Sequence, residues 1–245
     1  MVSIADDVNR EILRLWYAPE HGLVDRKPLM PLVYPELRGG GLLFVGLNPS
    51  FSEKAFRSFL VGSEWEDFDP QTFYAWRDRC DDFDVHRAQR VEAAALAAYE
   101  HYRRFARLAA SLETQWVHVD VFTLRDTSQK AALSQILRGG ARELVCTNLN
   151  GFGRAQLGLC TRLIQRLAPE LLVVANAAAS RLLVEALDGT FDEAAGHHVV
   201  RLGDRIVPAF FSSMWTQGAL DAFSAQRLEW QIRRVYRERA AATAR

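Results

Sequence analysis

Asn48 is the side chain whose position in the sequence best suits a chemical role. It follows an apolar run of strand length at residues 42–45 and lies in the segment Gly46-Leu47-Asn48-Pro49-Ser50. Gly46 permits a sharp turn, and Pro49 restricts the residue before it to extended backbone conformations. The pattern predicts a polar amide held at the carboxyl end of a buried strand, where open α/β sheets bind their ligands. An ordinary strand-to-loop turn explains the same residues equally well.

A second polar group lies at the end of another predicted strand, residues 116–122. Asp120 stands there among aliphatic neighbours, with Arg125 five residues later. A carboxylate in apolar surroundings is costly unless a hydrogen-bonding partner satisfies it. That partner is a ligand, Arg125 or backbone amides, and the sequence leaves these alternatives open.

The segment at residues 210–218 leaves the last predicted strand through two hydroxyls, Ser212 and Ser213, followed by Met214 and Trp215. Hydroxyls and free amides in such a loop can hold a phosphate, and large apolar side chains there can wedge between bases. Packing of Met214 and Trp215 into the core is the alternative. Asn176, which follows a further strand, adds another polar group or only caps the next helix.

These segments meet if the strands that carry them lie in one parallel sheet. Apolar runs of strand length predict strands at residues 42–46, 116–122, 171–175, 199–202 and 205–211. Helical spacing of apolar residues predicts helices at residues 5–17, 87–112, 131–137, 154–168, 177–187 and 217–240. This alternation is typical of a mainly parallel sheet with helices on both faces, within a single domain of residues 1–245.

Residues 51–85 interrupt the alternation. Acidic and aromatic residues dominate this stretch, including Trp65, Phe73, Tyr74 and Asp82. It is consistent with a lid or a partner surface, and equally with an irregular excursion that has its own small core.

The composition excludes several classes of protein. Acidic and basic residues number 30 each, so the net charge gives no overall attraction to nucleic acid. Of the basic residues, 27 are arginine, which is the better phosphate ligand, but a coding bias toward arginine would produce the same excess. The cysteines form no CxxC pair and the histidines lack metal spacing, so we expect no metal site and no disulfide framework. No apolar run reaches the roughly 18–20 residues that cross a bilayer, and the N-terminus is acidic. We therefore expect a cytoplasmic protein without membrane contact.

The motifs together resemble the uracil-DNA glycosylase superfamily, over roughly residues 40–235. Members carry a strand followed by Gly-x-(Asp/Asn)-Pro, and the mismatch-specific branch continues Gly-(Ile/Leu)-Asn-Pro-Gly; this chain departs from the latter at Ser50. Members also have a late strand followed by a His-Pro-Ser or Asn-Pro-Ser loop with an apolar wedge, which corresponds here to residues 211–215. Between the two lies a strand that ends in a base-reading residue, at about Asp120.

The resemblance implies a three-layer α/β/α sandwich with a central four-stranded, mostly parallel sheet. It implies a pocket for a base flipped out of DNA, in which Asn48 orients water toward the sugar C1′ and Phe51 or Phe59 stacks on the base. No metal or organic cofactor is needed. The residues that would contact nucleic acid are Gly46, Leu47, Pro49, Ser50, Phe51, Ser212, Ser213, Met214 and Trp215.

Two residues depart from the family pattern. Phe211 stands where a catalytic His or Asn is usual, so that donor to the leaving base is absent. Asp120 stands where an Asn usually reads uracil, and an ionised carboxylate accepts hydrogen bonds but donates none, which favours a base edge with N–H groups and disfavours the carbonyl edge of uracil. Either the substrate differs from uracil or the site binds a base without cleaving it. The leading hypothesis is a hydrolase that removes a damaged or deaminated base from DNA. The alternatives are a non-catalytic nucleic-acid-binding module of the same fold and an enzyme acting on free nucleosides or nucleotides.

Overall fold

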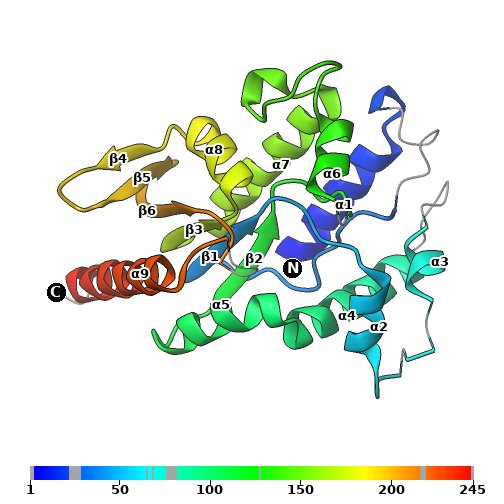
Figure 1. The fold of residues 1–245 in the computed structure, drawn as a ribbon, viewed down its shortest axis with the longest axis horizontal. Helices are drawn as coiled ribbons and strands as arrows, with labels where there is room; N and C mark the ends of the chain where they lie inside the picture. The colour runs from blue at the N-terminus through cyan, green and yellow to red at the C-terminus, as the bar shows by residue number, and fades with distance from the viewer. Residues whose placement is uncertain are drawn as a thin grey trace.

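A computed structural model describes residues 3–21, 29–64, 66–67, 69–75, 82–126, 128–215 and 219–243. Its centre is one sheet, in the order β2-β1-β3-β6-β5-β4 (Figure 1). The strands are β1 (Leu42–Gly46), β2 (Trp116–Asp120), β3 (Leu171–Ala175), β4 (Thr190–Asp192), β5 (His197–Leu202) and β6 (Arg205–Ser212). The first four in spatial order are mutually parallel, and β5 and β4 continue the sheet antiparallel. The α/β class and the mostly parallel sheet are confirmed, but the sheet has six strands where four were expected.

The described helices alternate with the strands, and several begin at a side-chain cap. Ser3, Asn150 and Asn176 each accept a hydrogen bond from a backbone N–H of the first turn that follows. The helices are α1 (Ile4–Tyr17), α2 (Glu53–Leu60), α3 (Pro70–Tyr74), α4 (Asp82–Ala98), α5 (Glu100–Ala110), α6 (Gln129–Ile136), α7 (Gly151–Leu167), α8 (Ala177–Ala186) and α9 (Ala222–Thr243).

Helices cover both faces of the parallel part of the sheet. In β1, Leu43 and Val45 belong to the core that contains the apolar faces of α1, α7 and α8, whereas Leu42 and Phe44 belong to the core formed with α5 and α9. All four side chains are at most 1% exposed. The prediction that this strand is buried on both faces is confirmed.

The predicted helix at residues 87–112 is wrong in one respect, because the chain breaks it in two at Tyr99. Tyr99 has an extended backbone (φ −75°, ψ 124°), which ends α4 and lets α5 start in a new direction. The two halves therefore serve different cores: α5 packs on the sheet, whereas α4 joins α2 and α3 in a separate small cluster that includes Met30, Phe56 and Tyr74. The described part of residues 51–85 is thus an excursion with its own core.

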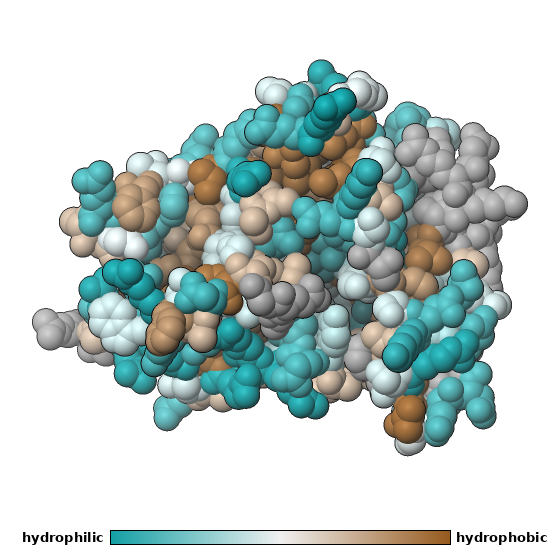
Figure 2. Space-filling model, viewed as in Figure 1, coloured by the Kyte–Doolittle hydropathy of each residue, from teal (hydrophilic) through white to brown (hydrophobic). Residues whose placement is uncertain are grey.

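The surface seen in Figure 2 is mostly hydrophilic, with apolar side chains gathered in a hollow near α6 and α7 at the top of the view. Among the described helices, none is long and apolar enough to cross a membrane. In the part of the chain that the structure describes, five large apolar side chains are exposed, two of them on α9: Val61, Phe191, Ile206, Phe223 and Trp230.

Candidate functional site

A cavity of about 90 Å³ lies at the carboxyl ends of β1, β2 and β3, and we call it the edge pocket. At about 10–15 Å³ for each water, a cavity of this size holds several water molecules. Three parts of its wall come from the ends of the strands: residues 46–50 after β1, Asp120 at the end of β2, and Asn176 after β3. A fourth part comes from residues 99–102 at the start of α5, and Met214 adds a fifth. Asn48 and Asp120, which are far apart in the chain, are therefore brought together.

Gly46 is needed at this edge because another side chain occupies the space beside its Cα. A Cβ built on Gly46 would collide with the Asp120 carboxyl and would lie 3.1 Å from Nε2 of His118. The parallel register pairs Gly46 with Asp120 directly, so the smallest residue faces the carboxyl group. The close approach leaves the carboxyl in the pocket wall while still burying it.

Burial dominates the chemistry of Asp120. The residue is 5% exposed, and burial raises the pKa of its carboxyl from 3.8 to about 8, with Arg125 opposing this shift and Glu92 adding to it. Its backbone N–H donates to the Tyr34 hydroxyl at 3.2 Å, but within the described ranges no hydrogen bond reaches its side chain. At pH 7 the side chain is mainly a neutral carboxylic acid, which offers one donor and one acceptor. The direction of this pKa shift opposes the interpretation of Asp120 as an ionised group that only accepts hydrogen bonds.

Of the alternatives that the sequence leaves open for Asp120, an ion pair with Arg125 is not formed, because Arg125 pairs with Glu92. Its guanidinium makes a buried ion pair with Glu92 of α4, donates from Nε to the Met30 carbonyl at 3.0 Å and lies 4.3 Å over the Tyr74 ring. Each of these partners lies in the small cluster formed by α2, α3 and α4 or in the segment that leads into it. Arg125 therefore joins the loop after β2 to that cluster, and the Asp120 side chain is left to other partners.

The Asn48 amide is held in one orientation by backbone carbonyls. Its Nδ2 donates to the carbonyls of Asp126, Pro49 and Leu124, at 3.1, 3.3 and 3.4 Å. Three acceptors around one end of the amide identify that end as the nitrogen. Within the described part of the chain the Oδ1 atom has no hydrogen-bond partner, so it is an oriented acceptor on a residue that lines the edge pocket.

Asn176 caps α8, as one of its two interpretations predicted. Its Oδ1 accepts from the backbone N–H groups of Ala178 and Ala179, at 2.9 and 3.1 Å. This leaves the amide nitrogen as a donor without a partner among the described residues, on a side chain that lines the edge pocket. Asn176 can therefore cap α8 through its amide oxygen and still act as a hydrogen-bond donor at the site through its amide nitrogen.

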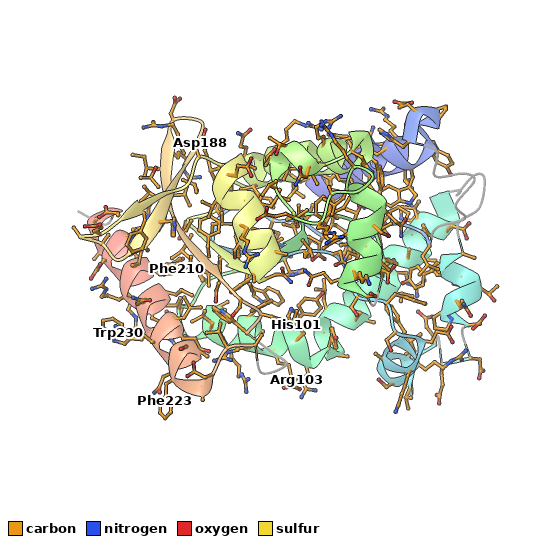
Figure 3. The ribbon with its side chains drawn as sticks, turned by 45° about the horizontal axis from the view of Figure 1, so that its top comes forward. His101, Arg103, Asp188, Phe210, Phe223 and Trp230 are labelled. Carbon is orange, nitrogen blue, oxygen red and sulfur yellow. The ribbon has the colours of Figure 1, made fainter. Side chains whose placement is uncertain are left out.

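Sequence reasoning missed the aromatic and histidine wall of the edge pocket. Tyr99, His101 and Tyr102 come from the α4–α5 break, and the His118 ring lies 5.0 Å from that of Tyr102 and 6.3 Å from that of His101. In Figure 3 His101 lies toward the middle of the molecule, whereas Arg103 points outward. Sequence reasoning weighs His118 only as a metal ligand, although its spacing of two from Asp120 in a strand is an available signal that the two side chains share a face.

Burial keeps both imidazoles of this wall uncharged. It lowers the pKa of His118 to about 3, with His101 contributing further, and it lowers the pKa of His101 below the ordinary value of 6.5. It also raises the pKa of Tyr102 well above 10.0. At neutral pH all three side chains are neutral groups that can donate a hydrogen bond. In the described part of the chain no group of His, Cys, Asp or Glu could hold a metal ion.

The loop after β6 contributes less than predicted. Met214 lines the edge pocket, but Ser212 donates its backbone N–H to Ser180 Oγ at 3.0 Å, and Ser213 Oγ donates to the Ala219 carbonyl at 3.3 Å. Neither serine lines the pocket. The Ser212 amide and the Ser213 hydroxyl instead hold the loop to the Ser180 side chain and to the Ala219 backbone.

Trp215 is not the exposed wedge that was predicted. It is 3% exposed and its ring lies 5.7 Å from that of Phe105 and 6.1 Å from that of Phe44. Arg104 covers its other side, 5.5 Å from the ring centre. Burial of so large an apolar surface in the α5–α9 core is more favourable than exposure at the loop tip.

Two further aromatic residues point away from the edge pocket. Phe211 is partly buried against the core that includes α8, 5.0 Å from the His198 ring, and it does not line the pocket. Phe51 packs on Phe56 and Tyr74, at 5.6 and 5.8 Å, rather than beside Asn48. The side chain of Phe59, the other candidate for stacking, and Cys80 lie outside the described residues.

No protein-family model matches this chain, and no curated protein matches it. Its function therefore has to be inferred from the edge pocket and the motifs that form it.

Proposed function

We propose that this protein is a DNA glycosylase-like hydrolase that accepts a flipped-out base in the edge pocket and hydrolyses its N-glycosidic bond. One observation carries the proposal: an oriented amide oxygen on Asn48 and a buried carboxyl on Asp120 line the same cavity at the carboxyl edge of a parallel sheet. The α/β/α layering that the resemblance implies agrees with helices on both faces of this sheet.

In this proposal Asn48 positions the nucleophile. Its free Oδ1 accepts a hydrogen bond from a water molecule and directs the water oxygen at C1′ of the sugar. An amide is too weak a base to remove the proton before attack, so its contribution is orientation. The bond from water to C1′ forms, the C1′–N bond breaks, and the base leaves with the electron pair while the water proton is released.

The leaving base needs hydrogen-bond donors, and the proposal assigns that task to neutral groups of the pocket wall. The Asn176 amide nitrogen, His101 and His118 line the pocket and can stabilise charge that develops on the base. A carboxylic acid whose pKa lies near the working pH also suits proton donation, which makes Asp120 the candidate acid. Together these groups replace the donor that Phe211 cannot supply.

The same neutral acid favours one class of base. One O–H donor beside one C=O acceptor is complementary to an edge that presents a carbonyl next to an N–H, which deaminated bases such as uracil, hypoxanthine and xanthine carry. An ionised Asp120 would reject such an edge, because two acceptors would then face the base carbonyl. Deaminated bases are therefore the first substrates to test.

The test is a panel of labelled duplexes and single strands that carry uracil, hypoxanthine, xanthine, ethenocytosine or a thymine mismatch, followed by alkali cleavage at abasic sites. We expect cleavage at a deaminated base, with a loss of about 100-fold or more in Asn48→Ala, the scale of losing one oriented polar group at a reacting centre. Asn148→Ala is the matched control, because that amide donates to the Glu143 carbonyl away from the pocket.

Each other outcome points to a different function. Binding of these DNAs without cleavage would replace the proposal with a non-catalytic nucleic-acid-binding module. Hydrolysis of free nucleosides with intact DNA left uncut would replace it with a small-molecule enzyme. Retained turnover in Asn48→Ala would remove Asn48 from the mechanism.

A further inference from the structure

We infer that the outer face of α9 is a docking surface for a single strand of nucleic acid. Five residues form this surface, which we call the α9 stripe: Phe223, Arg227, Trp230, Arg234 and Arg237. At 3.6 residues per turn they fall within an arc of about 80° and extend about 21 Å along the helix. The buried residues Ala225, Ile232 and Val235 lie on the opposite face, so none of the stripe residues belongs to the buried core of α9.

Two large aromatic side chains of the stripe are exposed to solvent. Phe223 is 83% exposed and Trp230 is 58% exposed, and both point outward from α9 in Figure 3. Neither packs in the core, and an aromatic pair on one exposed helix face is more typical of a binding surface than of scattered surface residues. Arg234 lies 5.3 Å over the Trp230 ring, which leaves the other face of that ring open to a partner in this arrangement.

The charge of α9 selects an anionic partner. The helix carries five arginines and two glutamates, a formal charge of +3 in a chain whose net charge is zero. Glu229 is turned toward Arg104 and Arg233, at 2.6 and 3.2 Å, and not toward the stripe. Glu238 approaches the stripe only at 3.9 Å from Arg234 Nε. Two copies of α9 facing each other would repel, which disfavours self-association through this surface.

Two arginines of the stripe are available to phosphates. Arg227 and Arg237 are exposed and, within the described residues, neither has an ion-pair or hydrogen-bond partner. Arg234 donates to the Ala195 carbonyl at 3.0 Å through one Nη and so is partly engaged. Asp221, the acid nearest the start of the stripe, is occupied as the cap of α9.

The alternation of aromatic rings and arginines favours a single strand over a duplex. Phe223 and Trp230 lie about 10.5 Å apart along the helix, with Arg227 between them. Rings stack on the faces of unpaired bases while arginines contact the backbone, which is how grooves for single strands are built. In a duplex the base faces are already stacked and paired, so these rings would have nothing to contact.

Elements that line the proposed site are also linked to α9. The loop that supplies Met214 to the edge pocket leads into α9, and α5, which supplies His101, contacts α9 through Arg104 and Glu229. A strand whose base enters the edge pocket can therefore continue along the stripe. The inference does not depend on the hydrolase proposal, because a strand without any damaged base tests it.

The experiment is fluorescence anisotropy with a labelled thymidine oligonucleotide and a labelled duplex of equal length, both undamaged, at several salt concentrations. We expect tighter binding of the single strand. Trp230→Ala should weaken it by about 5- to 150-fold with the salt dependence unchanged, and Trp230→Phe should retain most of the affinity. Arg227→Gln combined with Arg237→Gln should reduce the slope of log K against log salt by about 1.4, or about 0.7 for each phosphate contact.

The controls separate this surface from general effects. Arg142→Gln removes an exposed arginine from the loop after α6 and should change neither affinity nor salt slope. Binding of the undamaged strand is measured without any cleavage step, so failure of the hydrolase proposal leaves this result intact. The thermal unfolding of every α9 variant should match that of the wild type, because the substituted side chains are exposed.

Several outcomes would overturn the inference. These are the absence of salt-dependent binding to the single strand, equal affinity in all α9 variants, and a preference for the duplex. A dimer in solution that the same substitutions dissociate would overturn it as well, and would assign the stripe to a second copy of the chain.

Discussion

Replacing Asp120 with Asn should stabilise the protein at neutral pH, and the gain should grow as the pH rises. Burial raises the carboxyl pKa from 3.8 to about 8 in the folded protein. Between these values the unfolded chain releases a proton that the folded protein keeps. The contribution of Asp120 is therefore most favourable below pH 3.8, is lost progressively as the pH rises, and levels off above about pH 8. Asn has nearly the same shape and does not titrate.

The size of the effect follows from the window between the two pKa values. One pKa unit corresponds to about 1.36 kcal/mol, so the 3.2 units from 3.8 to pH 7 correspond to about 4.4 kcal/mol. Between pH 5 and pH 7 alone the change is about 2.7 kcal/mol. These values are upper bounds, because the carboxyl lines a cavity that water can enter.

The assay is urea denaturation of the wild type and Asp120→Asn at pH 5, 6, 7 and 8. The difference in free energy of unfolding between the two proteins at each pH cancels the titration of all other groups. We expect the advantage of the variant to increase by up to about 1.4 kcal/mol for each pH unit. Asp204→Asn, which makes the same substitution at an exposed residue in the turn between β5 and β6, is the matched control.

A difference that stays constant from pH 5 to pH 8 would refute the reasoning. Asp120 would then be ionised in the folded protein at neutral pH, and its assignment as a hydrogen-bond donor to a deaminated base would fail with it.

Three further predictions follow from side chains around the site. Glu92→Ala should destabilise the protein by about 3–5 kcal/mol in urea denaturation, because it leaves the buried Arg125 guanidinium without its ion pair; a loss below about 1 kcal/mol would mean that the pair is not formed. Trp215→Ala should lower the free energy of unfolding by about 3–5 kcal/mol, since it truncates a core side chain. Unchanged stability together with weakened DNA binding would instead support the prediction that Trp215 inserts between bases. Cys160 is buried, and burial raises the pKa of its thiol to about 12, so alkylation at pH 8, followed by peptide mass spectrometry, should be no faster than unfolding. Rapid labelling would contradict its burial.

The parts of the fold that were predicted correctly are those with a strong local signal. The strands at residues 42–46 and 171–175 agree with β1 and β3, because continuous apolar runs of that length have few alternatives to a strand buried on both faces. The strand β4 was missed because its three residues, Thr190–Asp192, are all exposed and show no apolar pattern. It pairs with β5 through backbone hydrogen bonds, which leave no mark on residue type.

The break at Tyr99 shows why the site wall could not be predicted. No Pro or Gly marks the break, and the alanine-rich segment before it has high helix propensity. The segments before and after Tyr99 pack in two different cores. The change of direction between them places Tyr102 and His101 in the wall of the pocket. Tertiary packing overrides local propensity here.

The sequence by itself determined which polar residues end the parallel strands, because Gly46, Asn48 and Asp120 follow apolar runs whose carboxyl ends must share one edge. Only the tertiary structure decided their chemical state and their neighbours. Depth of burial sets the protonation of Asp120, the carbonyls of a distant loop orient Asn48, and packing area takes Trp215 into the core. Each of these depends on contacts between segments far apart in the chain, which local sequence patterns do not encode.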